Sequence, residues 1–336
     1  LYLKNKLLEK IYILLSKAQK ALLIKEDIKK GKIIINSKFS SRRGNILFDE
    51  LPIYEGSHII TIDDASSPDL DGAFSIDKTG GIYILDVYIS DTPSFLIKNN
   101  EVMNEAYNRG NTLYLTLDNN KRYYIDMIPP FLSHTYLSLE KSLVGENHPK
   151  NVIKFNFIFG DNGELYSSSV SRVRTIINKN ITPTDAQALL ESYNCDKSSY
   201  SIKTLQELAI KVISNSQDDL YKTINPKVAL SLIAFPSILV NYYIGRESEF
   251  AIYRENGIYT RNNKGIYTSS VTPLRKFVSD INLMFFLQQK EVAMYPNKKL
   301  YWFQDNIDEV IIHLNEKDMI SKYANSNGQF VKKYLK

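Results

Sequence analysis

Four aspartates crowd into a short segment after an apolar run, and their types and spacing suggest chemistry. Asp63, Asp64, Asp69 and Asp71 fall within the segment Thr61–Phe74. Carboxylates packed this closely repel one another, and burial would raise their pKa values unless a cation lies among them. Mg²⁺ prefers oxygen ligands, and two such ions about 3.5–4 Å apart can clamp a phosphodiester during in-line attack by water. The segment therefore indicates a site for divalent metal and phosphate.

The same spacing also has a plainer interpretation. Aspartate is a common turn former, so the segment is compatible with a solvated acidic loop. Asp64 stands next to Asp63, and neighbouring residues on a strand point to opposite faces, so we expect only Asp63 to reach a shared site. The spacing alone leaves both interpretations open.

Other residue types exclude several kinds of site. The four histidines, His58, His134, His148 and His313, have no i,i+3 or i,i+4 pairing, so their spacing does not predict a zinc site. The single Cys195 excludes an internal disulfide and a cysteine-rich zinc site. The chain has no G-x-S-x-G segment, which argues against a serine hydrolase of the α/β type.

Strands are expected to position the aspartates. Residues 57–138 have the pattern of strands separated by polar turns, and the clearest strands are 58–63, 81–90 and 111–117. Residues 151–160 pair naturally with 164–171 across the turn Asp161-Asn-Gly163. The aspartates would then follow the end of the strand at 58–63.

Helical periodicity replaces this pattern after Arg174. Thr182 followed by Pro183 is typical of a helix start. The expected helices are 183–192, 201–214, 226–244, 273–289 and 315–335. A β-rich first half that leads into a helical second half indicates one α+β domain.

The first 55 residues form a separate prediction. Residues 1–30 predict an amphipathic helix, which we expect to pack on the body rather than to bind a membrane or a partner. Two short strands follow before residue 49, too few to complete a small β-barrel. We therefore divide the chain into 1–55, a remnant of a flanking module, and 56–336, the main domain. Because the chain starts without Met, we expect a fragment or a processed form.

The bulk composition is that of a folded protein. Of the 336 residues 43% are hydrophobic and 24% charged, and the net charge of +5 permits a polyanionic partner without demanding one. The longest apolar stretch, Val228–Val240, is too short to cross a bilayer and contains Pro236. No membrane partner is therefore expected. A single cysteine fits a reducing compartment, and we expect a cytoplasmic protein or one of an organellar matrix.

Five further segments extend the pattern begun by the aspartates, which read T-I-D and then D-x-D. They are Val87–Asp91 (VYISD), Asn104–Tyr114 (NEAYNRGNTLY), Met127–Leu139 (MIPPFLSHTYLSL), Ala251–Arg254 (AIYR) and Tyr267–Phe277 (YTSSVTPLRKF). In this order, over about residues 55–335, they resemble the catalytic (RNB) domain of the ribonuclease II/R family of 3′→5′ exoribonucleases. The resemblance implies an α+β catalytic domain built around a channel for RNA, and it interprets 1–55 as a remnant of a flanking RNA-binding module.

The resemblance also implies an activity and its residues. Family members thread single-stranded RNA 3′ end first and hydrolyse it one nucleotide at a time to nucleoside 5′-monophosphates. It implies Mg²⁺ as cofactor, held by Asp63, Asp69 and Asp71, and no nucleotide cofactor. Arg275 matches an arginine that contacts the scissile phosphate, which suits a planar guanidinium. Tyr114 matches an aromatic residue that stacks near the 3′-terminal base.

Two basic residues are expected along the phosphate path. Arg109 and Lys276 lie in the matching segments and could contact the RNA backbone. Each has an ordinary alternative, a surface ion pair for Arg109 and a solvated lysine for Lys276.

The chain departs from the family at one metal ligand. Gly72 stands where the family has a fourth aspartate, and the helix at Ser231–Ser237 lacks the family's acid and amide. Phosphoryl transfer depends on positioned charge, so an active exonuclease and an impaired pseudo-nuclease that binds RNA or acts as a scaffold both stay open. A function unrelated to RNA is the third alternative. Because the usual flanking RNA-binding barrels are not recognisable, other RNA-processing proteins are expected as partners.

Overall fold

The computed structural model describes residues 49–326, except 66, 117–121, 141–148, 194–195, 217–218, 262–265, 294 and 296. The helix predicted at 1–30 and the two strands predicted before residue 49 lie outside the described residues. The division of the chain at residue 55 therefore stays a prediction.

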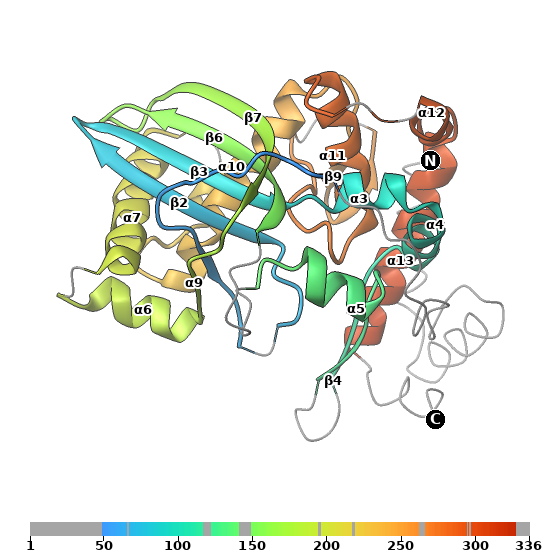
Figure 1. The fold of residues 1–336 in the computed structure, drawn as a ribbon, viewed down its shortest axis with the longest axis horizontal. Helices are drawn as coiled ribbons and strands as arrows, with labels where there is room; N and C mark the ends of the chain where they lie inside the picture. Colours follow the sequence, from blue (N-terminus) through green and yellow to red (C-terminus); the bar gives the residue numbers. More distant parts are fainter. Residues whose placement is uncertain are drawn as a thin grey trace.

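A six-stranded sheet forms the frame of the domain (Figure 1). Its order is β7-β6-β3-β2-β1-β8, and only β1 and β8 are parallel neighbours. The strands are β1 (Ile60–Ile62), β2 (Gly72–Thr79), β3 (Ile82–Ser90), β6 (Lys150–Phe159), β7 (Leu165–Thr175) and β8 (Lys179–Ile181).

The predicted hairpin at the edge of this sheet is confirmed. β6 and β7 pair antiparallel, and the turn between them places Gly163 at φ 81°, a value that favours glycine. Alternate residues of β6 such as Phe155 and Phe157 are fully buried, as the apolar–polar alternation requires.

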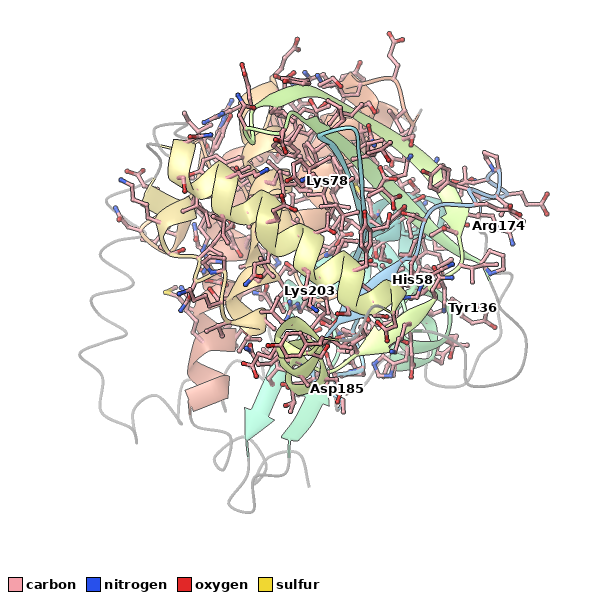
Figure 2. The ribbon with its side chains drawn as sticks, turned by 90° about the vertical axis from the view of Figure 1, so that its left-hand side faces the viewer. His58, Lys78, Tyr136, Arg174, Asp185 and Lys203 are labelled. Carbon is pink, nitrogen blue, oxygen red and sulfur yellow. The ribbon has the colours of Figure 1, made fainter. Side chains whose placement is uncertain are left out.

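Long helices cover one face of the sheet and build the main core. α7 (Lys197–Asn215) crosses this face in Figure 2, where Lys203 is labelled on it. The Lys78 ammonium of β2 lies 2.8 Å from the Glu207 carboxylate of α7. Deeper in the core, the ring of Phe286 in α11 (Phe277–Gln289) stacks 6.1 Å from that of Phe155. This packing confirms an α+β domain.

The remaining elements complete the described chain. They are α3 (Thr92–Lys98), α4 (Asn100–Arg109), β4 (Leu113–Thr116), β5 (Arg122–Ile125), α5 (Pro130–Leu132), the π-helix η1 (Ser133–Leu137), α6 (Pro183–Glu191), α8 (Asp219–Lys222), α9 (Ala229–Leu232), α10 (Ala234–Glu247), β9 (Tyr253–Glu255), β10 (Ile258–Thr260), α12 (Asn297–Asp305) and α13 (Ile307–Ser326). In Figure 1, α3, α4, α12 and α13 gather at the end of the molecule away from α7.

Several predicted elements are wrong in detail. The expectation of strands throughout 57–138 missed α3 and α4, where the buried Val102, Met103 and Ala106 have helical spacing. The helix expected at 226–244 is two helices, α9 and α10, with Pro236 in the first turn of α10, where its missing N–H is tolerated. The helix expected from 273 begins only at Phe277. The helices expected from 201 and from 315 begin earlier, at Lys197 and at Ile307.

Candidate active site

The sheet fixes the ends of the aspartate segment. Asp63 directly follows β1 and donates its backbone N–H to the carbonyl of Ile181, 3.1 Å away. Asp71 directly precedes β2 and accepts a backbone hydrogen bond from Ser90 at 2.9 Å. Asp63 is half-buried, whereas Asp64 is exposed, as the alternation along the chain suggested. The segment therefore carries its carboxylates between two neighbouring strands.

Asp71 connects this segment to the distant Arg275. Its side chain is 5% exposed, and its Oδ1 accepts a hydrogen bond of 2.7 Å from the backbone N–H of Leu274. Its Oδ2 lies 2.9 Å from Nε of Arg275. Burial raises the pKa of Asp71 to about 6 although Arg275 lowers it. The carboxylate is thus held in place yet remains short of compensating charge.

The pKa values of Asp63 and Asp69 are raised as well. Burial, followed by the charge of Asp71, raises the pKa of Asp63 to about 6. The same two causes, with Asp126 added, raise the pKa of Asp69 to about 7. Asp71 therefore contributes to the pKa shifts of both Asp63 and Asp69, which places each of these predicted metal ligands near Asp71.

A glycine turn brings Tyr114 to Arg275. α4 ends at Gly110, whose φ is 71°, and a Cβ there would lie 2.5 Å from Cβ of Lys317. The chain beyond it pairs with the segment around Arg275: Thr112 donates to the Arg275 carbonyl at 3.0 Å, and Phe277 donates to the Gly110 carbonyl at 2.9 Å. The side chains of Tyr114 and Arg275 also share a hydrogen bond. Burial raises the pKa of Tyr114, so its hydroxyl stays protonated.

Asp126 and His134 were not among the predicted site residues, but the fold places both beside Asp69. His134 Nε2 lies 3.6 Å from Asp69 Oδ1 and 3.6 Å from Asp126 Oδ1. Within the described residues, these three form the one group of His, Cys, Asp or Glu side chains with ligand atoms within 4.8 Å of one another. The only sequence signal was that both lie in or beside the motif at Met127–Leu139.

The two predicted phosphate-path residues are less exposed than expected. The Arg109 side chain is 5% exposed, lies 2.8 Å from the Glu105 carboxylate and donates to the backbone carbonyl of Asp126. Lys276 is half-buried, and burial followed by the charge of Arg254 lowers its pKa to about 8. Whether either residue contacts RNA stays a prediction.

A cavity of about 370 Å³ opens beside these carboxylates. Asp63, Asp71 and Arg275 line one part of it, and apolar residues such as Leu230 and Ile233 line another. Gly72 also lines it, and a Cβ at this position would meet its nearest neighbours only at 3.7 Å, an ordinary contact distance. A Cβ at position 72 would therefore fit without a clash.

The family of the chain follows from its sequence. The family model for the RNB domain matches residues 53–251. The chain belongs to the RNB-domain family. No curated protein matches it in sequence.

Solved structures agree on the fold. Apo RNase R of Mycoplasma genitalium is 13% identical and superposes with a TM-score of 0.74 over 94% of this chain and 64% of its own length. The exoribonuclease Dss1 of Candida glabrata is 14% identical, with a TM-score of 0.65 over 83% of this chain and 47% of that protein. Yeast Ssd1, described as a pseudonuclease, is 10% identical, with a TM-score of 0.62 over 84% of this chain and 45% of that protein. This RNB-domain chain thus spans less than two thirds of each, and the likeness shows the fold alone.

The same architecture therefore occurs in proteins described as ribonucleases and in one described as a pseudonuclease. Among the helices that the structure describes, none has the length and apolar character needed to span a membrane.

Proposed function

We propose that this RNB-domain protein is a Mg²⁺-dependent, processive 3′→5′ exoribonuclease that hydrolyses single-stranded RNA to nucleoside 5′-monophosphates. The observation that carries the proposal is the pairing of buried Asp71 with Arg275 beside two further carboxylates, Asp63 and Asp69. The family match and RNase R structures described with bound RNA add support.

The carboxylates suit a divalent metal. Both oxygens of Asp69 are buried without a hydrogen-bond partner. Burial raises the pKa values of Asp63, Asp69 and Asp71, and the charge of Asp71 raises those of Asp63 and Asp69 further. Hard oxygen donors that lack compensating charge are the donor set that Mg²⁺ prefers. Bound there, Mg²⁺ would offset this charge and stabilise negative charge that develops on a phosphate.

The side chains around the carboxylates would orient the RNA. Asp71 engages Nε of Arg275, and the Arg275 side chain remains 42% exposed, so its terminal N–H groups can donate to the scissile phosphate. Tyr114 is held beside Arg275, where its ring would stack on the 3′-terminal base. Lys276 would neutralise a phosphate next along the strand, whereas Arg109 would act by holding the backbone at Asp126.

A specific observation favours a second function, RNA binding without turnover. Gly72 lines the cavity but supplies no carboxylate, and the neighbouring Leu230 and Ile233 are apolar. Fewer metal ligands weaken charge stabilisation, on which phosphoryl transfer depends. In this alternative the protein would bind single-stranded RNA or serve as a scaffold for other RNA-processing proteins.

A labelled RNA separates the two functions. Purified protein is incubated with an unstructured RNA labelled at its 5′ end, with Mg²⁺ or with EDTA. The proposal expects a ladder that shortens from the 3′ end, that EDTA abolishes and that Arg275→Lys strongly weakens, whereas the exposed control Arg246→Lys has no effect. Intact RNA that is nevertheless retarded on a native gel would refute the proposal and support the second function.

A further inference from the structure

The group formed by Asp69, Asp126 and His134 has the geometry of a cation site. The two distances from His134 Nε2 to the carboxylate oxygens are 3.6 Å, and all three ligand atoms lie within 4.8 Å of one another. Ligands about 2.0–2.2 Å from a metal in tetrahedral arrangement stand about 3.4 Å apart, so small side-chain shifts would place one ion among them.

Four polar atoms of this group are buried without a hydrogen-bond partner. The Asp69 side chain is 1% exposed, and neither of its oxygens has a hydrogen-bond partner. Asp126 Oδ1 and His134 Nε2 are likewise buried and unsatisfied. A separation of 3.6 Å is too long for a hydrogen bond, so the imidazole does not satisfy the carboxylates as placed. Buried unsatisfied polar atoms are rare and costly, and a cation would satisfy all of them together.

Backbone hydrogen bonds fix the segments that carry these side chains. Leu70 is next to Asp69. Its carbonyl accepts a hydrogen bond of 2.9 Å from the backbone N–H of Leu139, and its own N–H donates one of 3.1 Å to Ser138 Oγ. These residues follow η1, a π-helix that carries His134, and π-helical turns are frequent at functional sites. Asp126 is fixed through its carbonyl by Arg109. The site is therefore built in advance of any ligand.

We propose that Asp69, Asp126 and His134 bind a divalent transition metal, Mn²⁺ or Zn²⁺, at a position distinct from the Mg²⁺ position beside Asp63 and Asp71. An imidazole nitrogen with two carboxylates suits Mn²⁺ and Zn²⁺, whereas Mg²⁺ favours an all-oxygen shell. Asp69 has two oxygens and would face both ions. The inference rests on the proposed function only for the part that the second ion plays in RNA hydrolysis. Binding itself needs no RNA.

Mn²⁺ binding tests the site directly. Protein freed of metal with EDTA and dialysed is titrated with MnCl₂ by calorimetry, and bound Mn²⁺ is examined by electron spin echo spectroscopy for coupling to an imidazole nitrogen. We expect His134→Ala to lose one bound Mn²⁺ per chain, or at least tenfold in affinity, together with the nitrogen coupling. His58→Ala is the matched control, because His58 bonds Ser198 away from the group.

A second variant keeps the test decisive if His134→Ala does not fold. Asp126→Asn has the same shape and should weaken the same site at least tenfold, whereas Asp63→Asn should leave the nitrogen coupling intact. Unchanged titration and coupling in folded His134→Ala or Asp126→Asn would overturn the inference even if the protein degrades RNA. Conversely, Mn²⁺ bound through His134 in a protein that never degrades RNA would support the site and refute the proposed function.

Discussion

Asp71→Asn should make the metal-free protein more stable while it removes the activity. The Asp71 carboxylate is buried, and its pKa rises from 3.8 to about 6 in the folded chain. Each pKa unit corresponds to about 1.36 kcal/mol, so ionising Asp71 costs the folded state about 3 kcal/mol at pH 7.5. Asparagine has nearly the same shape and cannot ionise, so the variant avoids this cost.

The pH dependence of this effect has a definite sign. Because the pKa of Asp71 is raised on folding, the folded state binds more protons than the unfolded state between about pH 4 and pH 6. Stability of the wild type therefore falls as pH rises through this window and stays low above it. The advantage of Asp71→Asn should be about 3 kcal/mol at pH 7.5, shrink below about pH 6, and nearly vanish below about pH 4.

Thermal and urea unfolding in EDTA would measure this difference. For a domain of this size about 3 kcal/mol corresponds to an increase in Tm on the order of 5 °C. Asp77→Asn, which changes an exposed aspartate of β2, should leave Tm nearly unchanged. Added Mg²⁺ should stabilise the wild type more than the variant. An Asp71→Asn protein that is less stable than the wild type in EDTA at pH 7.5 would refute the reasoning, because the Arg275 ion pair would then outweigh the cost of burial.

Three further predictions follow from the geometry. Gly72→Asp should raise the rate of RNA hydrolysis about 10²-fold by restoring a carboxylate where the nearest atoms leave 3.7 Å, and an equal rise in Gly72→Asn would rule out charge as the cause. Gly110→Ala should lower the free energy of unfolding in urea by about 1–3 kcal/mol, more than Gly80→Ala. Both glycines have positive φ, but of the two only Gly110 lacks room for a Cβ, so equal losses of stability would contradict this reasoning. Lys276 has a pKa of about 8, so RNA affinity should fall up to about tenfold from pH 7 to pH 9 as the lysine loses its charge. The affinity of Lys276→Arg should not change over this range, and a fall of the same size in that variant would assign the effect to another group.

The sequence predicted the strand framework and several site residues well because their signals are local. Alternation along 151–160 and a turn with Gly163 gave the β6–β7 hairpin. Asp63 and Asp71 stand at the ends of β1 and β2, with Asp69 in the connection between them. Arg275 and Tyr114 were found through motifs that the structure brings side by side.

What the sequence could not give depends on contacts between distant segments. No histidine or acid stands at metal-ligand spacing from His134 in the sequence. Its neighbours in the fold come from elsewhere: Asp69 from the connection between β1 and β2, and Asp126 from the residue after β5. Arg109 looked like a surface cation, yet Glu105 one helical turn earlier makes it a buried pair that supports Asp126. α3 and α4 were missed because both are short, and an apolar run such as Phe95–Ile97 in α3 is equally compatible with a strand.

The most direct test of the account measures the product of RNA hydrolysis. Single-stranded RNA is incubated with the wild type or Asp71→Asn in Mg²⁺, and released nucleotides are resolved by chromatography. We predict steady release of nucleoside 5′-monophosphates by the wild type, at least 10²-fold above Asp71→Asn, since the variant lacks the carboxylate that pairs with Arg275. Release at the same rate by both proteins, or by neither while the RNA stays bound, would contradict the claim that this site is a working exoribonuclease.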